Sequence, residues 1–275
     1  MSATDGLKVE IEEERLFREL EKLAEFSDTP PPSVTRIVYT ETDRKARRYL
    51  RELFLEAGLL VREDPLGNTF VRWEGEDRTL PPIGTGSHID ALPHAGRFDG
   101  TVGVLGGLEA IRALQRAGFT PRRSIELVVF TSEEPTRFGL GCLGSRAMTG
   151  ALTPSQIRAL RDADGISCDE ARLAAGCSGR LEEVELRPGY YDWWVELHIE
   201  QGPILEREGT SIGLVEAIAA PAALNVTFEG TGGHAGAVLM PERHDALCAA
   251  AETVLAVERA ARTSPSPDAV ATVGT

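Results

Sequence analysis

The sequence predicts an α/β protein in which a mostly parallel sheet is flanked by helices and followed by a smaller α+β domain. The first observation is an alternation of strand-like apolar segments and helical segments over residues 81–200. Such alternation is typical of a parallel sheet with helices on both faces. The second is a composition of 42% hydrophobic and 26% charged residues over 275 positions, which favours a folded globular chain over a disordered one.

The expected elements follow in chain order. Leucine and aromatic residues at helical spacing predict two amphipathic helices at the start, and a Pro-Leu-Gly-Asn turn then separates two extended segments. The alternating region predicts three buried strands, a helix after the first and a polar helix after the second. In order, these elements are helices 11–26 and 43–59, extended segments within 60–76, strand 81–90, helix 101–118, strand 124–130, helix 154–162 and strand 190–200.

The character of the sequence changes near Glu216. Residues 214–230 are apolar and strand-like, and an alanine-rich helix is expected over 243–262 after the glycine-rich GTGGHAG. We therefore predict a first domain over 1–215 and the beginning of a second over 216–275. The final DAVATVGT alternates like a strand and ends inside that pattern, so we expect a truncated segment in which the C-terminal part of the first domain is also missing.

Charge and cysteine content favour a small-molecule substrate. The net charge is −14, so the chain carries no basic footprint for nucleic acid or an anionic membrane surface. The four cysteines form no CxxC pair, and no apolar run approaches the roughly 18 residues of a membrane span. The N-terminus has no basic and apolar layout of a secretory signal, and we expect reduced thiols and a cytoplasmic protein.

Imidazole and carboxylate side chains gather where the predicted strands end. Ligands of open α/β sheets bind at the carboxyl ends of the strands, so these side chains are expected to share one site. A mixture of nitrogen and oxygen ligands without thiolate suits Zn²⁺, Mn²⁺ or a similar divalent ion. The residues are His88 and Asp90 in GSHID, Glu133 and Glu134 in FTSEEPTRFG, His198, Glu200 and Gln201 in ELHIEQG, and Asp99 in GRFDG before a helix.

The two adjacent glutamates are expected to have different roles, one as a metal ligand and the other as a proton acceptor. Neighbouring side chains on a strand point to opposite faces. One of Glu133 and Glu134 can therefore bind a metal while the other takes a proton from the attacking water. A further carboxylate such as Asp99 suits a bridge between two ions. The residues alone leave open which glutamate has which role.

Five segments resemble the signature blocks of the aminoacylase and carboxypeptidase G type metallohydrolase superfamily. Within it they are similar to the branch of allantoate amidohydrolase, ureidoglycolate amidohydrolase, β-ureidopropionase and N-carbamoyl-L-amino-acid hydrolase. EEPTRFG and AIAAPAALNVTFEGTGGHAGAVLMP are most similar to ureidoglycolate amidohydrolase. The blocks are GSHIDALPHAGRFDGTVGVLGGLEA, FTSEEPTRFG, GSRAMTG, ELHIEQGPILE and GGHAGAVLMPERHDAL.

The resemblance implies a catalytic first domain that binds two divalent ions, Mn²⁺ or Zn²⁺. It implies that His88 and His198 hold one ion and that Asp99 bridges the two. It also implies that Glu134 holds the second ion and that Glu133 is the general base.

Three further residues receive roles from the resemblance. Asp90 orients His88, and Gln201 faces the substrate. The second domain becomes a lid and dimerisation domain whose His234 reaches the site of a partner subunit in a homodimer and polarises the scissile carbonyl. The family also has a histidine on the second metal and an asparagine and an arginine on the substrate carboxylate, and we expect these beyond Thr275.

The expected activity is metal-dependent hydrolysis of a ureido or carbamoyl C–N bond with release of ammonia. The substrate would be a small carboxylate-bearing molecule such as ureidoglycolate, allantoate or an N-carbamoyl-L-amino acid. Two alternatives stay open. One is an aminoacylase or dipeptidase acting on N-acyl amino acids, and the other is a non-catalytic, dimerising relative.

Overall fold

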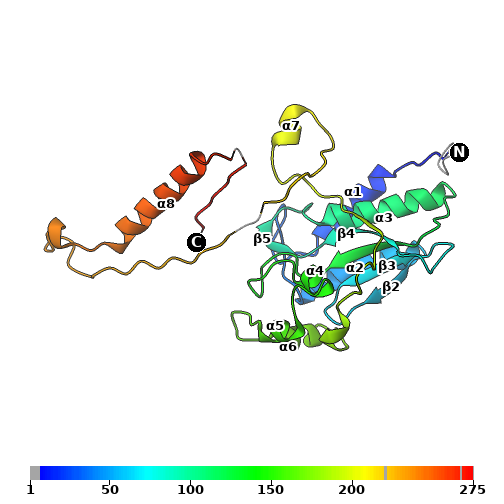
Figure 1. Ribbon diagram of the computed structural model, residues 1–275, viewed down its shortest axis with the longest axis horizontal. Coiled ribbons are helices and arrows are strands. Elements are labelled where there is room, and N and C mark those ends of the chain that lie inside the picture. The colour runs from blue at the N-terminus through cyan, green and yellow to red at the C-terminus, as the bar shows by residue number, and fades with distance from the viewer. Residues whose placement is uncertain (1–6, 220–221, 267, 275) are drawn as a thin grey trace. The chain divides into compact units, whose positions relative to one another are not determined.

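The computed structural model describes residues 7–219, 222–266 and 268–274 (Figure 1). The chain divides into two compact units, Met1–Ser211 and Ile212–Thr275. The domain limits expected from the sequence, 1–215 and 216–275, stay a prediction. Among the described residues, no helix is both long and apolar enough to cross a membrane.

A five-stranded mixed sheet organises the first unit. The pairs β2–β3 and β3–β6 are antiparallel, whereas β6–β4 and β4–β7 are parallel, so only β3 runs against the other four strands. This sheet confirms the α/β class. Its strands, in spatial order, are β2 (Leu60–Glu63), β3 (Thr69–Trp73), β6 (Ile125–Phe130), β4 (Ile83–His88) and β7 (Trp193–Val195). A separate pair joins β1 (Val34–Arg36) to β5 (Ala91–Ala95).

Helices cover both faces of the sheet, and β6 contributes to both cores because its side chains alternate. Leu127 and Val129 pack with one group of helices, and Val128 packs with the other. Figure 1 shows α1 and α3 on one side of the strands and α4, α5 and α6 on the other. The helices are α1 (Glu13–Ala24), α2 (Glu41–Glu56), α3 (Thr101–Arg116), α4 (Leu143–Met148), α5 (Pro154–Ala159) and α6 (Cys168–Ala174), with a 3₁₀ turn over Leu181–Glu183.

The edge strand β7 is shorter than expected from residues 190–200. Only three of its residues pair with β4. Trp193 is 71% exposed, whereas Trp194 packs against Phe130 with ring centroids 5.4 Å apart. The alternation of side chains along a strand explains why one tryptophan faces the core and its neighbour does not.

The second unit has helices but no strand in its described part. The expected alanine-rich helix is α8 (Ala246–Arg262), preceded by a 3₁₀ turn over Met240–Glu242; α7 (Ile204–Glu208) lies earlier, in the first unit. The strands expected over 214–230 and 268–275 do not form in the described residues of these ranges. A strand needs a partner for its backbone hydrogen bonds, and no described residue pairs with these segments.

Candidate metal centre

His88 ends β4, where its imidazole is 3% exposed. Its Nδ1 lies 2.9 Å from the backbone carbonyl oxygen of Asp90. A carbonyl oxygen only accepts, so Nδ1 carries the proton and Nε2 keeps a free lone pair. Gly100 lies against this ring, since a Cβ at that position would meet Nε2 at 2.5 Å. Only glycine fits at residue 100, because any side chain there would collide with the His88 Nε2 that would bind a metal.

Asp99 and His198 complete a three-residue cluster with His88. Each of the three offers a ligand atom, and these atoms all lie within 4.8 Å of one another. The His198 Nε2 lies 3.3 Å from Asp99 Oδ1, and the two imidazole rings are 6.2 Å apart. The fold brings these three residues together from separate segments. His88 is at the end of β4, Asp99 precedes the N-cap of α3, and His198 follows β7.

The chemistry of this cluster fits a divalent cation. Asp99 Oδ1 is buried and accepts no hydrogen bond in the described structure. A buried carboxylate oxygen without a donor is costly, and a cation bound between Asp99 and the two imidazoles would satisfy it. Nitrogen and oxygen ligands of this kind are those that Zn²⁺ and Mn²⁺ accept.

Asp90 connects the ends of β4 and β6. Its carboxylate is fully buried and accepts the backbone N–H groups of Glu133 at 3.2 Å and Glu134 at 2.9 Å. Burial raises the pKa of this carboxyl, while His88 and the two N–H groups act in the opposite direction. His88 contacts the carbonyl of Asp90 at 2.9 Å, and the nearest carboxylate oxygen is 3.8 Å from Nδ1. Asp90 therefore fixes the loop that carries both glutamates.

The two glutamates lie in different surroundings. Glu133 Oε2 is 3.6 Å from His88 Nε2, and Oε1 accepts the thiol of Cys142 at 3.2 Å. Burial, followed by the charge of Glu133, raises the pKa of Glu134 to about 7. The structure brings Glu133 to the edge of the cluster but does not include Glu134 in it. The metal role expected for Glu134 stays a prediction.

Cys142 was not singled out from the sequence as a site residue. It is one of four cysteines, and nothing in its spacing to the others distinguishes it. Its position nine residues after Glu133 places it where the loop returns to the end of β6. That return depends on the folded loop and is not visible in the local pattern.

The segment after His198 contributes one contact to the cluster and one to its own helix. Gln201 Nε2 donates to Asp99 Oδ2 at 2.9 Å. The carboxylate of Glu200 accepts the N–H groups of Ile204 and Leu205 at the start of α7. Gln201 is thus bound to a candidate ligand in this structure, and its expected contact with substrate stays a prediction.

His234 belongs to the second unit, where its side chain is exposed. Its Nδ1 accepts the N–H of Gly236 at 3.1 Å. Arg243 donates to the carbonyls of Ala235 and Val238 and so shapes the same loop. The expected action of His234 on a partner subunit's substrate stays a prediction.

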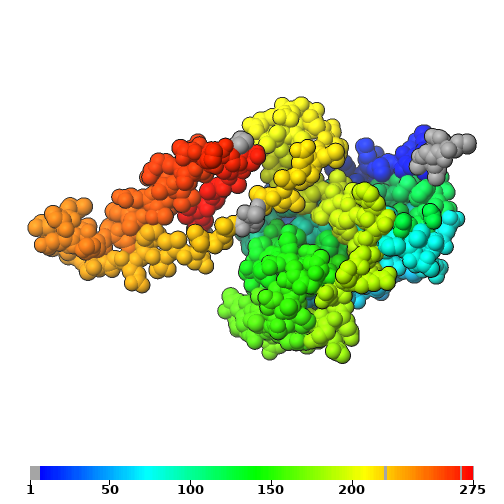
Figure 2. Space-filling view, viewed as in Figure 1, coloured from blue at the N-terminus to red at the C-terminus, as the bar shows by residue number. Residues whose placement is uncertain are grey.

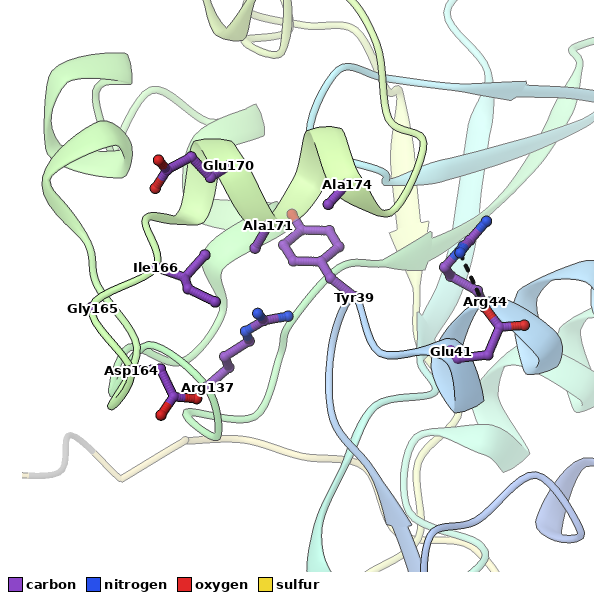
Figure 3. Close-up of a pocket in the computed structure, with 10 residues that line it drawn as sticks. All are labelled: Tyr39, Glu41, Arg44, Arg137, Asp164, Gly165, Ile166, Glu170, Ala171 and Ala174. Atoms are coloured by element: carbon purple, nitrogen blue, oxygen red, sulfur yellow. Dashed lines mark hydrogen bonds and ion pairs between the residues drawn. The ribbon is translucent and has the colours of Figure 1, made fainter.

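A pocket of about 450 Å³ lies away from these residues, between the start of α2 and the region of α6 (Figure 3). Its charges are mixed, and Arg44 is already paired with Glu41 at 3.0 Å. None of the candidate metal or catalytic residues lines it. The lining consists of Tyr39, Glu41, Arg44, Arg137, Asp164, Gly165, Ile166, Glu170, Ala171 and Ala174.

Curated proteins that are similar in sequence to this chain are named as hydrolases. The chain is 54% identical over 265 residues to a ureidoglycolate hydrolase of Arabidopsis thaliana, covering 94% of this chain and 56% of that protein. It is 40% identical to an N-carbamoyl-L-amino acid amidohydrolase of Geobacillus stearothermophilus, covering 96% of this chain and 64% of the relative. The chain thus spans only about half to two thirds of the length of these curated relatives.

Solved structures agree with the fold. A crystal structure of AtUAH in complex with glyoxylate superposes with a TM-score of 0.86 at 51% identity, covering 94% of this chain and 63% of that one. A hydantoinase/carbamoylase family amidase from Burkholderia ambifaria gives a TM-score of 0.73 at 38% identity, covering 92% of this chain and 62% of that one. The resemblance expected from the motifs is confirmed. Residues 84–273 match the description "Peptidase family M20/M25/M40", and the chain belongs to this family.

Proposed function

We propose that the protein containing this chain is a metal-dependent amidohydrolase that cleaves a ureido or carbamoyl C–N bond and releases ammonia. The observation that carries the proposal is the His88–Asp99–His198 cluster, in which one oxygen of Asp99 has no hydrogen-bond donor and His88 lies beside Glu133. Similarity to a ureidoglycolate hydrolase and to an N-carbamoyl-L-amino acid amidohydrolase supports the same bond type.

The proposed cofactor is a pair of divalent ions, Mn²⁺ or Zn²⁺. His88 and His198 would hold one ion and Glu134 the other, and Asp99 would be a ligand of both ions. When bound, the ions supply Lewis-acid polarisation of the substrate carbonyl and increase the acidity of the attacking water. Burial and the neighbouring Glu133 carboxylate raise the pKa of Glu134 to about 7, so a cation beside it would stabilise its charged form.

Glu133 is the proposed general base. Its carboxylate lies beside the cluster, and its side chain is 38% exposed, so water can reach it. Glu133 would take the proton of the attacking water and later deliver a proton to the departing nitrogen, which leaves as ammonia. A general base must lie within hydrogen-bond reach of the proton that it takes. The Glu133 carboxylate lies beside His88, a proposed metal ligand, and would therefore be close to a water at the metal site.

His234 and Gln201 are proposed to act on the substrate. His234, supplied by a partner subunit of a homodimer, would donate to the developing oxyanion, where one well-placed donor contributes substantially to rate. Gln201, now bound to Asp99, would turn towards the substrate. The preferred substrate is ureidoglycolate, since identity to the ureidoglycolate hydrolase of Arabidopsis thaliana exceeds that to the N-carbamoyl-L-amino acid and allantoate amidohydrolases.

The test is ammonia release by the natural full-length protein from ureidoglycolate, allantoate and N-carbamoyl-L-amino acids, with Mn²⁺ or Zn²⁺ supplied. We expect release from at least one substrate and about two ions bound for each chain. His88→Ala should lose both metal and activity, whereas His94→Asn should keep both, because the His94 side chain is exposed and outside the cluster. A metal-loaded protein that releases no ammonia from any of these substrates would refute the proposal.

A second candidate is hydrolysis of N-acyl amino acids or dipeptides, favoured by the peptidase family to which residues 84–273 belong. Only carbamoyl-type substrates yield ammonia directly. The same metal-loaded protein is therefore assayed with N-acetyl amino acids and dipeptides, with the free amino acid as the product measured. Turnover of these substrates without ammonia release would replace the first proposal by this one.

A further inference from the structure

Glu133 is held by residue 142 through both side chain and backbone. The Cys142 Sγ lies 3.2 Å from Glu133 Oε1, and the Cys142 N–H donates to the Glu133 carbonyl at 2.6 Å. The other carboxylate oxygen, Oε2, is the one that lies 3.6 Å from His88 Nε2. The two oxygens of Glu133 therefore have different neighbours: one lies beside the thiol and the other beside His88.

The backbone of Cys142 adopts a conformation that favours glycine. Its φ is 56° and its ψ is 31°, in the left-handed region, where a side chain other than glycine or asparagine is strained. Leu143 and Gly144 continue the return of the loop by donating to the carbonyls of Ser132 and Thr131. A residue with a side chain therefore occupies a position where glycine would be less strained, and this side chain contacts Glu133. Strain of this kind at a site agrees with a functional constraint.

The thiol acts as a donor in this contact. Burial and the neighbouring Glu133 carboxylate raise the pKa of Cys142 to about 11, so the sulfur stays protonated near neutral pH. A protonated thiol beside a carboxylate oxygen can donate its only hydrogen to it. The Glu133 side chain is 38% exposed, and without this contact its long side chain has more rotamers to sample.

We propose that Cys142 is a positioning residue that holds Glu133 by an S–H···Oε1 hydrogen bond, so that Oε2 is turned towards the metal cluster. This rests on the proposed role of Glu133 as general base. Cys142 itself does not contact the reacting atoms. Its removal should lower kcat, because the base is less often in place, and should leave KM and metal content nearly unchanged.

Three substitutions separate this role from a structural one. Cys142→Gly removes the thiol and the backbone strain together, so the protein should be at least as stable as the unsubstituted protein, yet kcat should fall about tenfold. Cys142→Ala should show the same fall with the strain retained. Cys142→Ser restores an O–H donor and should recover most of kcat. Cys248→Ala is the matched control, because Cys248 is exposed in α8 and outside the site.

The result that overturns the proposal is a wild-type kcat in both Cys142→Gly and Cys142→Ala. Equal loss in Cys142→Ser and Cys142→Ala would also overturn it, since the hydrogen bond would then have no part. Loss of bound metal in parallel with kcat would mean that residue 142 supports the cluster rather than Glu133.

A readout that needs no activity tests the contact itself. The S–H stretching band of Cys142, isolated as the Raman difference between the unsubstituted protein and Cys142→Ala, should lie at lower frequency than that of a free thiol. It should move to higher frequency in Glu133→Ala. An unshifted band overturns the proposed hydrogen bond whatever the kinetics. A shifted band in a protein that releases no ammonia would refute the proposed function while keeping Cys142 as the residue that holds Glu133.

Discussion

The two units of the chain differ in how their elements are stabilised. In the first, Leu127, Val128 and Phe70 are fully buried between the sheet and its helices. In the second, the apolar side chains of α8 remain largely exposed, with Leu247 at 77% and Leu255 at 52%. The first unit therefore has a tertiary core, whereas the second has a helix without one among its described residues.

This difference shows which local signals suffice for structure. The helix α8 forms because its hydrogen bonds lie within the helix, its interior is rich in alanine, and Asp245 caps its start by accepting the Leu247 N–H at 3.0 Å. The apolar segment before it has side chains as exposed as Leu224 at 88% and forms no strand in its described part. A helix satisfies its own backbone, whereas a strand depends on a neighbour.

The largest expected effect is on catalysis, and it compares a residue of the first unit with a residue of the second. Glu133→Gln should reduce ammonia release by the natural full-length protein by about 10³-fold, because a general base is lost. His234→Ala, in the second unit, should reduce it by about 10²-fold, as expected for one oxyanion donor. Steady-state kinetics and metal analysis measure both, and metal content should be unchanged. A greater loss for His234→Ala would move the main catalytic contribution to the second unit.

The next effect compares the two units in stability. Leu127→Ala removes a fully buried side chain from β6, which pairs with a strand on each side, and should cost about 2–5 kcal/mol in the free energy of unfolding. Leu255→Ala should cost less than about 1 kcal/mol, because its side chain is 52% exposed and alanine favours the helix. Urea denaturation of this chain measures both. A similar cost at the two positions would show that α8 is packed in solution.

A smaller effect concerns pH. The pKa of Glu134 is raised to about 7 in the metal-free fold from an ordinary value of 4.5, so the folded state holds this proton more tightly than the unfolded state. The contribution of Glu134 to stability is therefore fully present below about pH 4.5 and is lost as pH rises through about 7. Because the group is partly exposed, the effect should be smaller than that of Leu127→Ala.

Thermal unfolding of the metal-free protein between about pH 5 and pH 8 measures this contribution, with Glu134→Gln as the control. The difference in melting temperature between the two proteins should change with pH in favour of Glu134→Gln as pH rises. A constant difference across this range would contradict the raised pKa.

The smallest expected effect is confined to the start of α8. Asp245→Ala removes the side-chain acceptor of the Leu247 N–H and should cost about 1 kcal/mol of local helix stability. Amide exchange in the first turn of α8 should increase while exchange in β6 is unchanged. Faster exchange in both places would mean that the two units unfold together.

The sequence by itself determined the helices and the neighbourhood of the site. Helices α1 and α2 were predicted from periodicity, α3 from the alternation of segments and α8 from its alanine content, and all four lie close to their expected limits because these signals are local. His88 and the glutamate pair were expected at strand ends; His88 is the last residue of β4, and the glutamates follow β6. The matching motif blocks extended this to a ligand set, of which His88, Asp99 and His198 lie together.

Only the tertiary structure decided how these residues contact one another. The Asp90 carboxylate binds the backbone of a loop more than 40 residues later, Gln201 binds Asp99 across 102 residues, and Cys142 returns to Glu133. The apolar segment near residue 224 stays without a strand although its pattern favours one. Helical hydrogen bonds connect residues four apart and can be predicted from a short window, whereas strand pairing and side-chain contacts join distant segments whose approach depends on the whole fold.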